Sequence, residues 1–143
     1  MTVQSPERIT YEGHQYPTAS RPLDDYFNDA RPAPNFAAVT RSRSSSCWRG
    51  YIGHWEIHDG LLRLLDLQAP YANPAQSLLY LVFPTTHSPI KADWFSGEIR
   101  LPKGEVLRYI HYGPAVYEEE VVLLVEHGVL VGSRIIDHRL DPA

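Results

Sequence analysis

The sequence predicts a mostly β protein: a single antiparallel β-sandwich or barrel-like domain over residues 1–143, with one short N-terminal helix. Short stretches of alternating apolar and polar residues recur along the chain, and turn signals separate them at intervals of about eight to twelve residues. The stretch from Cys47 to Leu67 combines a tight-turn dipeptide with a matching alternation. An α+β layout, with the helix packed across one bent antiparallel sheet, is the alternative.

The first expected elements are a hairpin and the helix. Residues Ile9 to Tyr16 predict two short strands joined at Glu12-Gly13. The segment from Thr18 to Ala30 is typical of a short helix, because Ser20 can cap its first turn and Pro22 suits an early helical position.

Proline, arginine and serine dominate residues 31–46, which predicts a flexible loop. Within this loop, Phe36 to Thr40 is a candidate strand. Arg41 and Arg43 form a dense basic spot, which we interpret as part of a solvated loop rather than an anion site.

The central hairpin turns at Asp59-Gly60, because a type I′ turn needs positive φ at both central residues. This turn places Glu56 opposite Arg63, an opposite-charge pair across the strands. Because side chains alternate between faces, one face is apolar and is predicted to lie in the core. That face carries Gly53, Trp55, Ile57, Leu62 and Leu64.

A nearly continuous apolar run, Ser77 to Phe83, predicts a central strand buried on both faces. A second hairpin is expected after it, with strands at Asp93 to Leu101 and Glu105 to Tyr112. Its turn would be Pro102-Lys103-Gly104.

The last hairpin is expected to join Tyr117 to Glu126 with Val129 to Ile136 through a turn at His127-Gly128. The tail, residues 137–143, is polar and predicted to be frayed.

Composition excludes some classes of partner. A formal net charge of -4 and a pI near 5.9 argue against nucleic acid, which clustered Lys and Arg bind. The first ten residues, MTVQSPERIT, lack the pattern of a secretory leader, and no apolar run reaches the roughly 18 residues of a membrane span. With a single cysteine in addition, we expect a cytoplasmic protein with no membrane association.

Several residues are weak candidates for catalysis. His54, Glu56 and His58 form a His-x-Glu-x-His pattern, but on a strand the two histidines lie about 13 Å apart, so a site would need His111 or another group from elsewhere. Cys47 is a candidate thiol nucleophile. The simpler interpretation is a half-exposed polar strand face and a buried cysteine, so we expect neither a cofactor nor a metal.

Tyrosine and tryptophan with arginine dominate interface hot spots, and several such residues stand near expected strand ends. We therefore assign a candidate binding surface. It comprises Arg49, Tyr51, Trp94, Tyr112 and Tyr117.

Two segments also share a pattern with known sequences: CWRGY with WEI and DG in Cys47 to Leu67, and DWFSGEI with PKGE in Ala92 to Glu118. The pattern resembles small uncharacterised bacterial proteins, and this resemblance assigns no catalytic residue.

The sequence therefore favours a non-enzymatic binding protein that contacts another protein, of the bacterial immunity or accessory type. It also allows a homo-oligomer through a strand edge. The alternative is a small-ligand-binding β-barrel, or a small enzyme that uses His and Glu groups.

Overall fold

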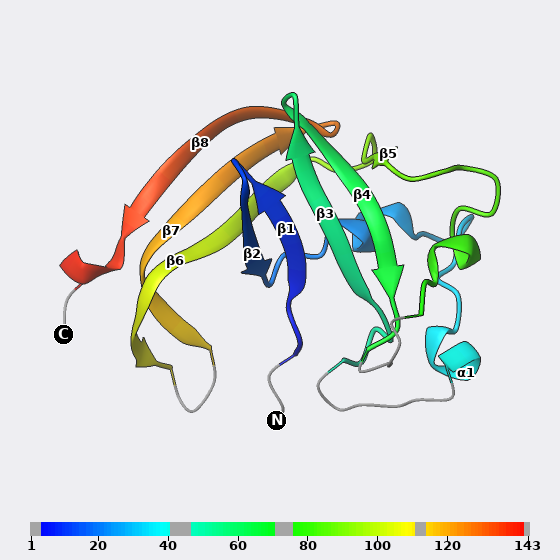
Figure 1. Ribbon diagram of the computed structural model, residues 1–143, viewed down its shortest axis with the longest axis horizontal. Coiled ribbons are helices and arrows are strands. Elements are labelled where there is room, and N and C mark those ends of the chain that lie inside the picture. Colours follow the sequence, from blue (N-terminus) through cyan, green and yellow to red (C-terminus); the bar gives the residue numbers. More distant parts are fainter. Residues whose placement is uncertain (1–3, 41–46, 71–75, 111–113, 142–143) are drawn as a thin grey trace.

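The computed structural model describes residues 4–40, 47–70, 76–110 and 114–141. Eight strands form one sheet in the order β2-β1-β3-β4-β8-β7-β6, with β5 beside β4 (Figure 1). The mostly β class is confirmed. The expected sandwich or closed barrel is not confirmed, because no strand pairing joins β2 to β6 in the described part of the chain.

The N-terminal hairpin is confirmed, with β1 (Glu7–Tyr11) antiparallel to β2 (His14–Thr18). Glu12 and Gly13 both have positive φ, as the turn requires. However, β1 runs parallel to β3, so the sheet is mixed rather than antiparallel.

The expected N-terminal helix is not confirmed: the chain forms only the 3₁₀ turn η1 (Pro22–Tyr26). The carbonyl of Pro22 accepts a hydrogen bond of 2.9 Å from the indole N–H of Trp94, a tertiary bond that competes with continuation of the helix.

The candidate strand at Phe36 to Thr40 is wrong, because these residues form the short helix α1 (Phe36–Thr40). The side chain of Asn35 accepts from the backbone N–H of Ala38 at 3.1 Å, which favours a helical first turn. Phe36 packs against Tyr51 with ring centroids 4.9 Å apart. Residues 41–46, including Arg41 and Arg43, lie outside the described residues.

The central hairpin is confirmed as β3 (Ile52–His58) and β4 (Leu61–Gln68), turning at Asp59 and Gly60 with positive φ. Glu56 lies opposite Arg63 and is ion-paired to it. The register shifts between His54 and Trp55, so His54 faces Asp66, one residue beyond the partner that an unbroken ladder from the turn would give it.

The predicted buried strand from Ser77 to Phe83 is wrong. Only Ser77 bridges to β4, and the chain then turns into the 3₁₀ segment η2 (Leu79–Leu81). Leu78 is fully buried while Tyr80 is exposed, so one side of this segment packs on the core and the other side faces solvent. An apolar run this short does not by itself distinguish a strand from a turn that packs on a core.

The predicted turn at Pro102-Lys103-Gly104 is also wrong. After the short β5 (Ile90–Lys91), β6 (Gly97–Tyr109) runs through these residues and pairs with β7 (Ala115–Glu126). Gly104 has positive φ within an irregularity of the ladder, where the Glu118 carboxylate accepts from the N–H of Glu105 at 2.8 Å.

The last hairpin is confirmed: β7 turns at His127 and Gly128 into β8 (Val129–Asp137). The tail continues as the 3₁₀ turn η3 (His138–Leu140), whose N-cap Asp137 accepts from the N–H of Arg139 at 2.9 Å.

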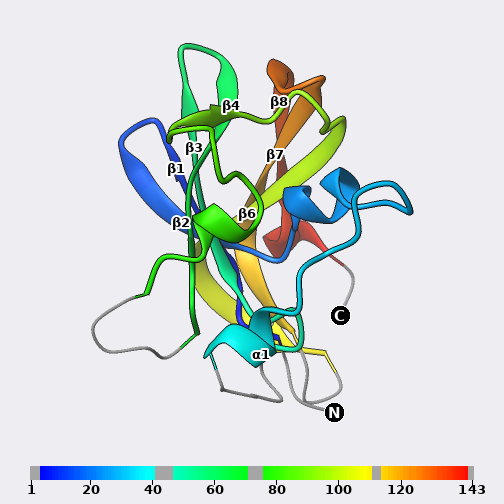
Figure 2. The same cartoon turned by 90° about the vertical axis from the view of Figure 1, so that its right-hand side faces the viewer.

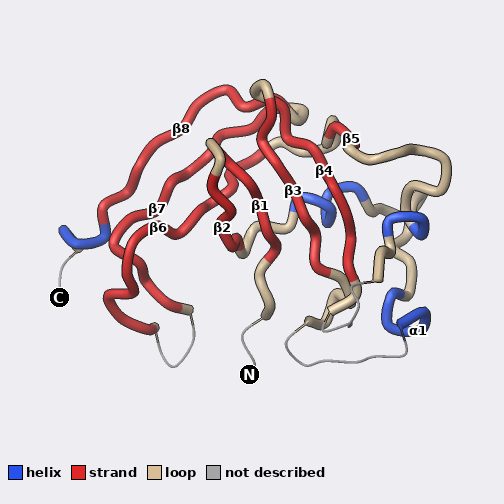
Figure 3. Tube along the Cα trace, viewed as in Figure 1, coloured by secondary structure: helices blue, strands red, loops and turns tan. Residues whose placement is uncertain are grey.

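The core lies between the strands and the helical segments that cover one side of the sheet. Figure 2 looks onto that side, where η1 (blue), α1 (cyan) and η2 (green) lie in front of the strands, which Figure 3 traces in red. The predicted core face is largely confirmed, with Trp55, Leu62 and Leu64 almost fully buried. Among the described residues, no helix has the length and apolarity to cross a membrane.

Candidate functional site

A buried carboxylate organises the segment that the sequence singled out. Glu7 is fully buried, and its Oε2 accepts from the N–H of Gly53 and from Arg49 Nη2, each at 2.7 Å. Its Oε1 accepts from the indole N–H of Trp55 at 3.2 Å. Because a buried charge is costly unless paired, Arg49 and these N–H groups are what allow Glu7 to lie inside. The CWRGY and WEI motifs therefore build the junction of β1 with β3.

Three of the residues that the sequence predicts to bind a partner make contacts within the protein instead. Arg49 is ion-paired to Glu7 and almost fully buried. Tyr51 is buried, its hydroxyl lies 3.4 Å from Asp24, and burial together with Glu7 raises its pKa. Trp94 packs edge-on against Tyr26 with ring centroids 4.8 Å apart. We leave these three out of the surface proposed below.

The candidate catalytic residues are not gathered around one point. His58 is exposed at the end of β3, His54 is half-buried four residues earlier, and Glu56 is ion-paired to Arg63. Cys47 is buried and its thiol donates to the carbonyl of Tyr51 at 3.3 Å. Among the described residues, no group of three or more His, Cys, Asp or Glu side chains is arranged to hold a metal ion.

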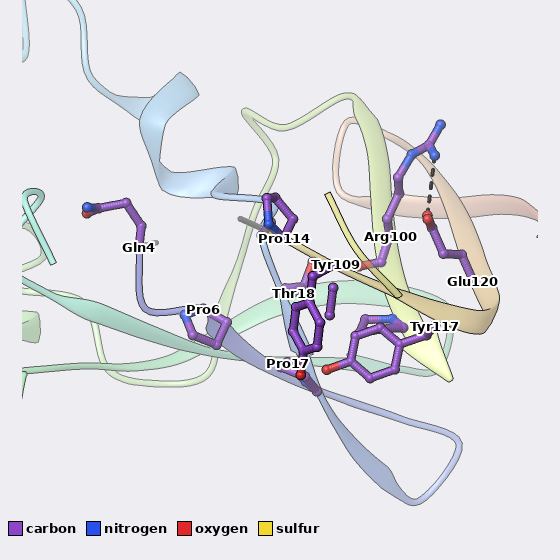
Figure 4. A pocket seen from close by; sticks show the side chains of 12 residues that line it. Gln4, Pro6, Pro17, Thr18, Arg100, Tyr109, Pro114, Tyr117 and Glu120 are labelled. Atoms are coloured by element: carbon purple, nitrogen blue, oxygen red, sulfur yellow. Dashed lines mark hydrogen bonds and ion pairs between the residues drawn. The ribbon is translucent and has the colours of Figure 1, made fainter. Parts of the chain in front are cut away.

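Two predicted residues, His111 and Tyr112, lie outside the described residues. The remaining one, Tyr117, lies in a cleft of about 530 Å³ between the N-terminal hairpin and the far half of β6 and β7 (Figure 4). We call it the Pro–Tyr cleft. It is defined by Pro6, Pro17, Thr18, Tyr109, Pro114 and Tyr117.

Distant segments assemble this cleft. Thr18 Oγ1 donates to the carbonyl of Arg100 at 2.8 Å, and the N–H of Arg100 lies 3.4 Å from Ser20 Oγ, so these hydroxyls hold the end of β2 against β6. Tyr117 pairs with Val106 across the β6–β7 ladder. The cleft thus occupies the place where the two ends of the sheet meet without completing a barrel.

A chain of charged residues begins at the rim of the cleft, which Arg100 and Glu120 line, and continues away from it. Glu120 lies between Arg100, at 3.3 Å, and His138 Nε2, at 2.8 Å. His138 Nδ1 lies 2.7 Å from Asp141, which also pairs with Arg108 at 2.9 Å. Positive and negative groups alternate along this chain, so the rim is charged locally but balanced.

The rim contacts shift two pKa values in opposite directions. Hydrogen bonding to Asp141, followed by hydrogen bonding to Glu120, raises the pKa of His138. Hydrogen bonding to His138, with a further contribution from Arg108, lowers the pKa of Asp141. Because both ring nitrogens of His138 contact carboxylates, the imidazolium form is favoured. This histidine fastens η3 to β7 and has no free nitrogen for acid–base chemistry.

Comparison with known proteins gives no match: no protein family model, curated protein or solved structure is similar to this chain.

Sequence reasoning missed most of the cleft. The sequence predicts that Tyr109 lies on the returning strand of a short hairpin. It lies instead at the exposed end of one long strand, β6. One signal was present: Pro17 lies inside a strand, and proline within a strand marks an edge. That signal locates the open end of the sheet.

Proposed function

We propose that this protein is a non-enzymatic binding protein that recognises another protein through the Pro–Tyr cleft. The observation that carries the proposal is the apolar cleft, whose lining residue Tyr109 belongs to a stretch with several exposed apolar side chains on and after β6. This stretch comprises Val106, Leu107, Tyr109 and Ile110. Exposed apolar surface beside a cleft is typical of interaction sites.

The chemistry of the cleft suits a protein partner. Proline and tyrosine offer apolar area at low cost in conformational entropy, and tyrosine adds a hydroxyl that can hydrogen-bond at the rim. Arg100 and Glu120 supply charges at the edge of the apolar area, where they contribute more to specificity than to affinity. An immunity or accessory protein that neutralises or assists one partner would need such a surface.

The backbone edge of β6 is a less suitable contact than its side chains. Arg100 already bonds Thr18 and Ser20, and Pro102 has no N–H to offer. We therefore expect the partner to insert side chains into the cleft rather than add a strand to β6.

The test is affinity capture from the native host with three baits: the wild type, Tyr109→Ser and Tyr80→Ser. Tyr109 is 67% exposed in the cleft, and Tyr80 is 55% exposed but does not line it, so the pair is matched in chemistry and exposure. We expect one protein to be captured equally by the wild type and Tyr80→Ser and about tenfold less by Tyr109→Ser, the loss typical of an interface hot spot. Equal capture by all three baits would contradict the proposal.

A small apolar ligand is a second candidate occupant, because the cleft volume of about 530 Å³ falls within the usual range for ligand sites. Native mass spectrometry of the purified protein distinguishes the two occupants. A retained small mass that Tyr109→Ser lacks would favour the ligand, and a mass equal to the chain alone would favour the protein partner.

A further inference from the structure

In addition to the cleft, β8 has an edge that no other strand covers over most of its length in the described residues, although the side chain of Tyr11 contacts Ser133 there. Its pairing with β4 consists of a single position, Leu61 opposite Val129, and the N–H of Leu130 donates to Gly60 O at 2.8 Å. Beyond this point β8 pairs only with β7 in the described part of the chain. Figure 1 shows β8 at the outer rim of the sheet.

The pattern of pairing determines which backbone groups of β8 point outward. The backbone N–H and C=O of Arg100 point toward β2 and therefore away from β7. The N–H and C=O of its partner Val122 must then point toward β8, where they pair with the N–H and C=O of Arg134. Successive residues alternate in direction. Ser133 and Ile135 therefore direct both their N–H and their C=O groups to the open side of β8. Asp137 offers only its N–H there, because its C=O begins η3.

The two exposed edges of this sheet differ in how well the sequence protects them against the addition of another strand. Three features of β6 discourage strand addition. The hydroxyl groups of Thr18 and Ser20 contact the backbone of Arg100, Pro102 has no N–H, and the ladder has a bulge at Gly104. The strand β8 also has an irregularity, at Val131, but it contains no proline and no lysine. Its Ile135 is 60% exposed, so an apolar side chain rather than a charged one stands at this part of the edge.

The charges near the β8 edge are already paired within the chain. Arg134 binds Glu98 at 2.9 Å, and Asp137 binds Arg139 at 3.0 Å. An identical edge can therefore approach without bringing an unpaired charge with it.

We infer that the β8 edge binds the β8 edge of a second copy of this chain, antiparallel about a twofold axis at Ile135. Outward-pointing residues must face each other, which allows twofold axes at residues 133 to 136. An axis at Ile136 sets Ser133 opposite Arg139 of η3, so its ladder is shorter than that of an axis at Ile135. An axis at Ser133 brings Asp137 of the second copy beside Val129, where β4 already lies. An axis at Arg134 sets two arginines directly opposite, which is unfavourable.

The axis at Ile135 avoids both problems, because the residues that follow Asp137 turn into η3, which His138 holds against Glu120 of β7, and so do not continue along the edge toward β4. It sets Ile135 against its own copy, Ser133 against Asp137, and Arg134 against Ile136. The contact is isologous, so the same residues serve both copies and the assembly closes as a dimer. A short strand edge buries less than a standard interface, so we expect a weak dimer that is monomeric at about 10 µM and dimeric at about 500 µM.

The first experiment is sedimentation velocity over this concentration range on the wild type, Ile135→Lys and Tyr80→Lys. We expect Ile135→Lys to remain monomeric, because two lysines would meet on the axis. Tyr80→Lys replaces an exposed side chain that lies outside both β8 and the cleft, so it should dimerise like the wild type. A wild type that stays monomeric throughout, or an Ile135→Lys variant that still dimerises, would overturn the inference.

Disulfide trapping tests the register on a variant that keeps the edge. Residues in a hydrogen-bonded antiparallel pair have Cα atoms about 5.5 Å apart, within reach of a disulfide. Oxidised Ile135→Cys should form a covalent dimer, whereas Ser133→Cys, four residues out of register with its copy, should not. The native Cys47 is buried and serves as the background control. Efficient linkage through Ser133→Cys would overturn the register, and capture of a foreign strand by Ile135→Cys would overturn the choice of a second copy.

Discussion

At the scale of single residues, the feature that most constrains this sequence is the space around Glu7. A Cβ added to Gly53 would lie 2.3 Å from the Glu7 Oε1 atom and 2.6 Å from the indole nitrogen of Trp55. The glycine is thus required because the carboxylate occupies the position of a side chain.

We predict that Gly53→Ala lowers the free energy of unfolding by roughly 3 kcal/mol, because it displaces Glu7 from its partners in the core. Gly132→Ala is the matched control, since its nearest neighbour would be a Leu124 methyl group at 3.6 Å. Chemical denaturation measures both. Equal effects of the two substitutions would show that the Glu7 site does not set the requirement for glycine.

A second residue-scale prediction concerns the ion pair itself. Glu7→Gln leaves the guanidinium of Arg49 buried without its carboxylate, so we expect a loss of about 3–5 kcal/mol in unfolding free energy. The exposed pair Lys91–Asp93 provides the comparison, because Asp93→Asn should change stability by less than about 1 kcal/mol. A small effect of Glu7→Gln would mean that the network tolerates a neutral group.

At the scale of elements, tight turns were predictable and long-range partners were not. The three hairpins at Glu12-Gly13, Asp59-Gly60 and His127-Gly128 follow from local backbone chemistry, because each dipeptide accepts positive φ. Pro102-Lys103-Gly104 has similar composition, yet the bulge and the Glu118 carboxylate let β6 continue through it. The parallel pairing of β1 with β3 joins segments far apart in sequence, which no local pattern specifies.

The same reasoning explains what could be predicted of the candidate site. Tyr117 was identified because tyrosine near a strand end is typical of contact surfaces. Pro6, Pro17 and Thr18 were not, because they reach the cleft only when β2 lies against β6. The ion pair of Arg49 could not be predicted from the sequence. An arginine next to aromatic residues has the same local pattern whether it lies on a surface or, as here, pairs with a buried carboxylate.

The attachment of η3 to β7 is predicted to depend on pH. The pKa of His138 is raised above its ordinary value of 6.5 by Asp141 and Glu120, so the folded state binds the proton more tightly than the unfolded state. The resulting stabilisation is complete below about pH 6.5 and is lost as the pH rises through the raised pKa.

Thermal melting of the wild type and His138→Gln between about pH 5.5 and 9 measures this effect. We expect the midpoint of the wild type to fall with rising pH by more than that of the variant, which cannot titrate at this position. The pKa of the neighbouring Asp141 is lowered, so this carboxylate stays ionised across the range and does not account for a difference. Parallel curves would show that His138 does not couple η3 to pH.

At the scale of the whole molecule, the sheet has nearly become a barrel. Side chains connect the two ends of the sheet. Thr18 Oγ1 donates to the carbonyl of Arg100 at 2.8 Å, at the position where a closed barrel would have backbone hydrogen bonds between β2 and β6. Thr18 is buried, so its hydroxyl has little access to water. The cleft lies directly beside this junction, which links the shape of the fold to the proposed binding site.

We predict that Thr18→Val, which keeps the shape of the side chain and removes its hydroxyl, lowers the free energy of unfolding by about 1–2 kcal/mol, because it leaves the Arg100 carbonyl without this donor. Amide hydrogen exchange should rise in β2 and in the first half of β6 and remain unchanged in the central β3–β4 hairpin. Ser20→Ala is the control, since its contact with Arg100 is longer, at 3.4 Å, and exposed. If Thr18→Val accelerated exchange equally throughout the sheet, the junction would be part of the global core rather than a local closure, and the cleft could not open independently of the fold.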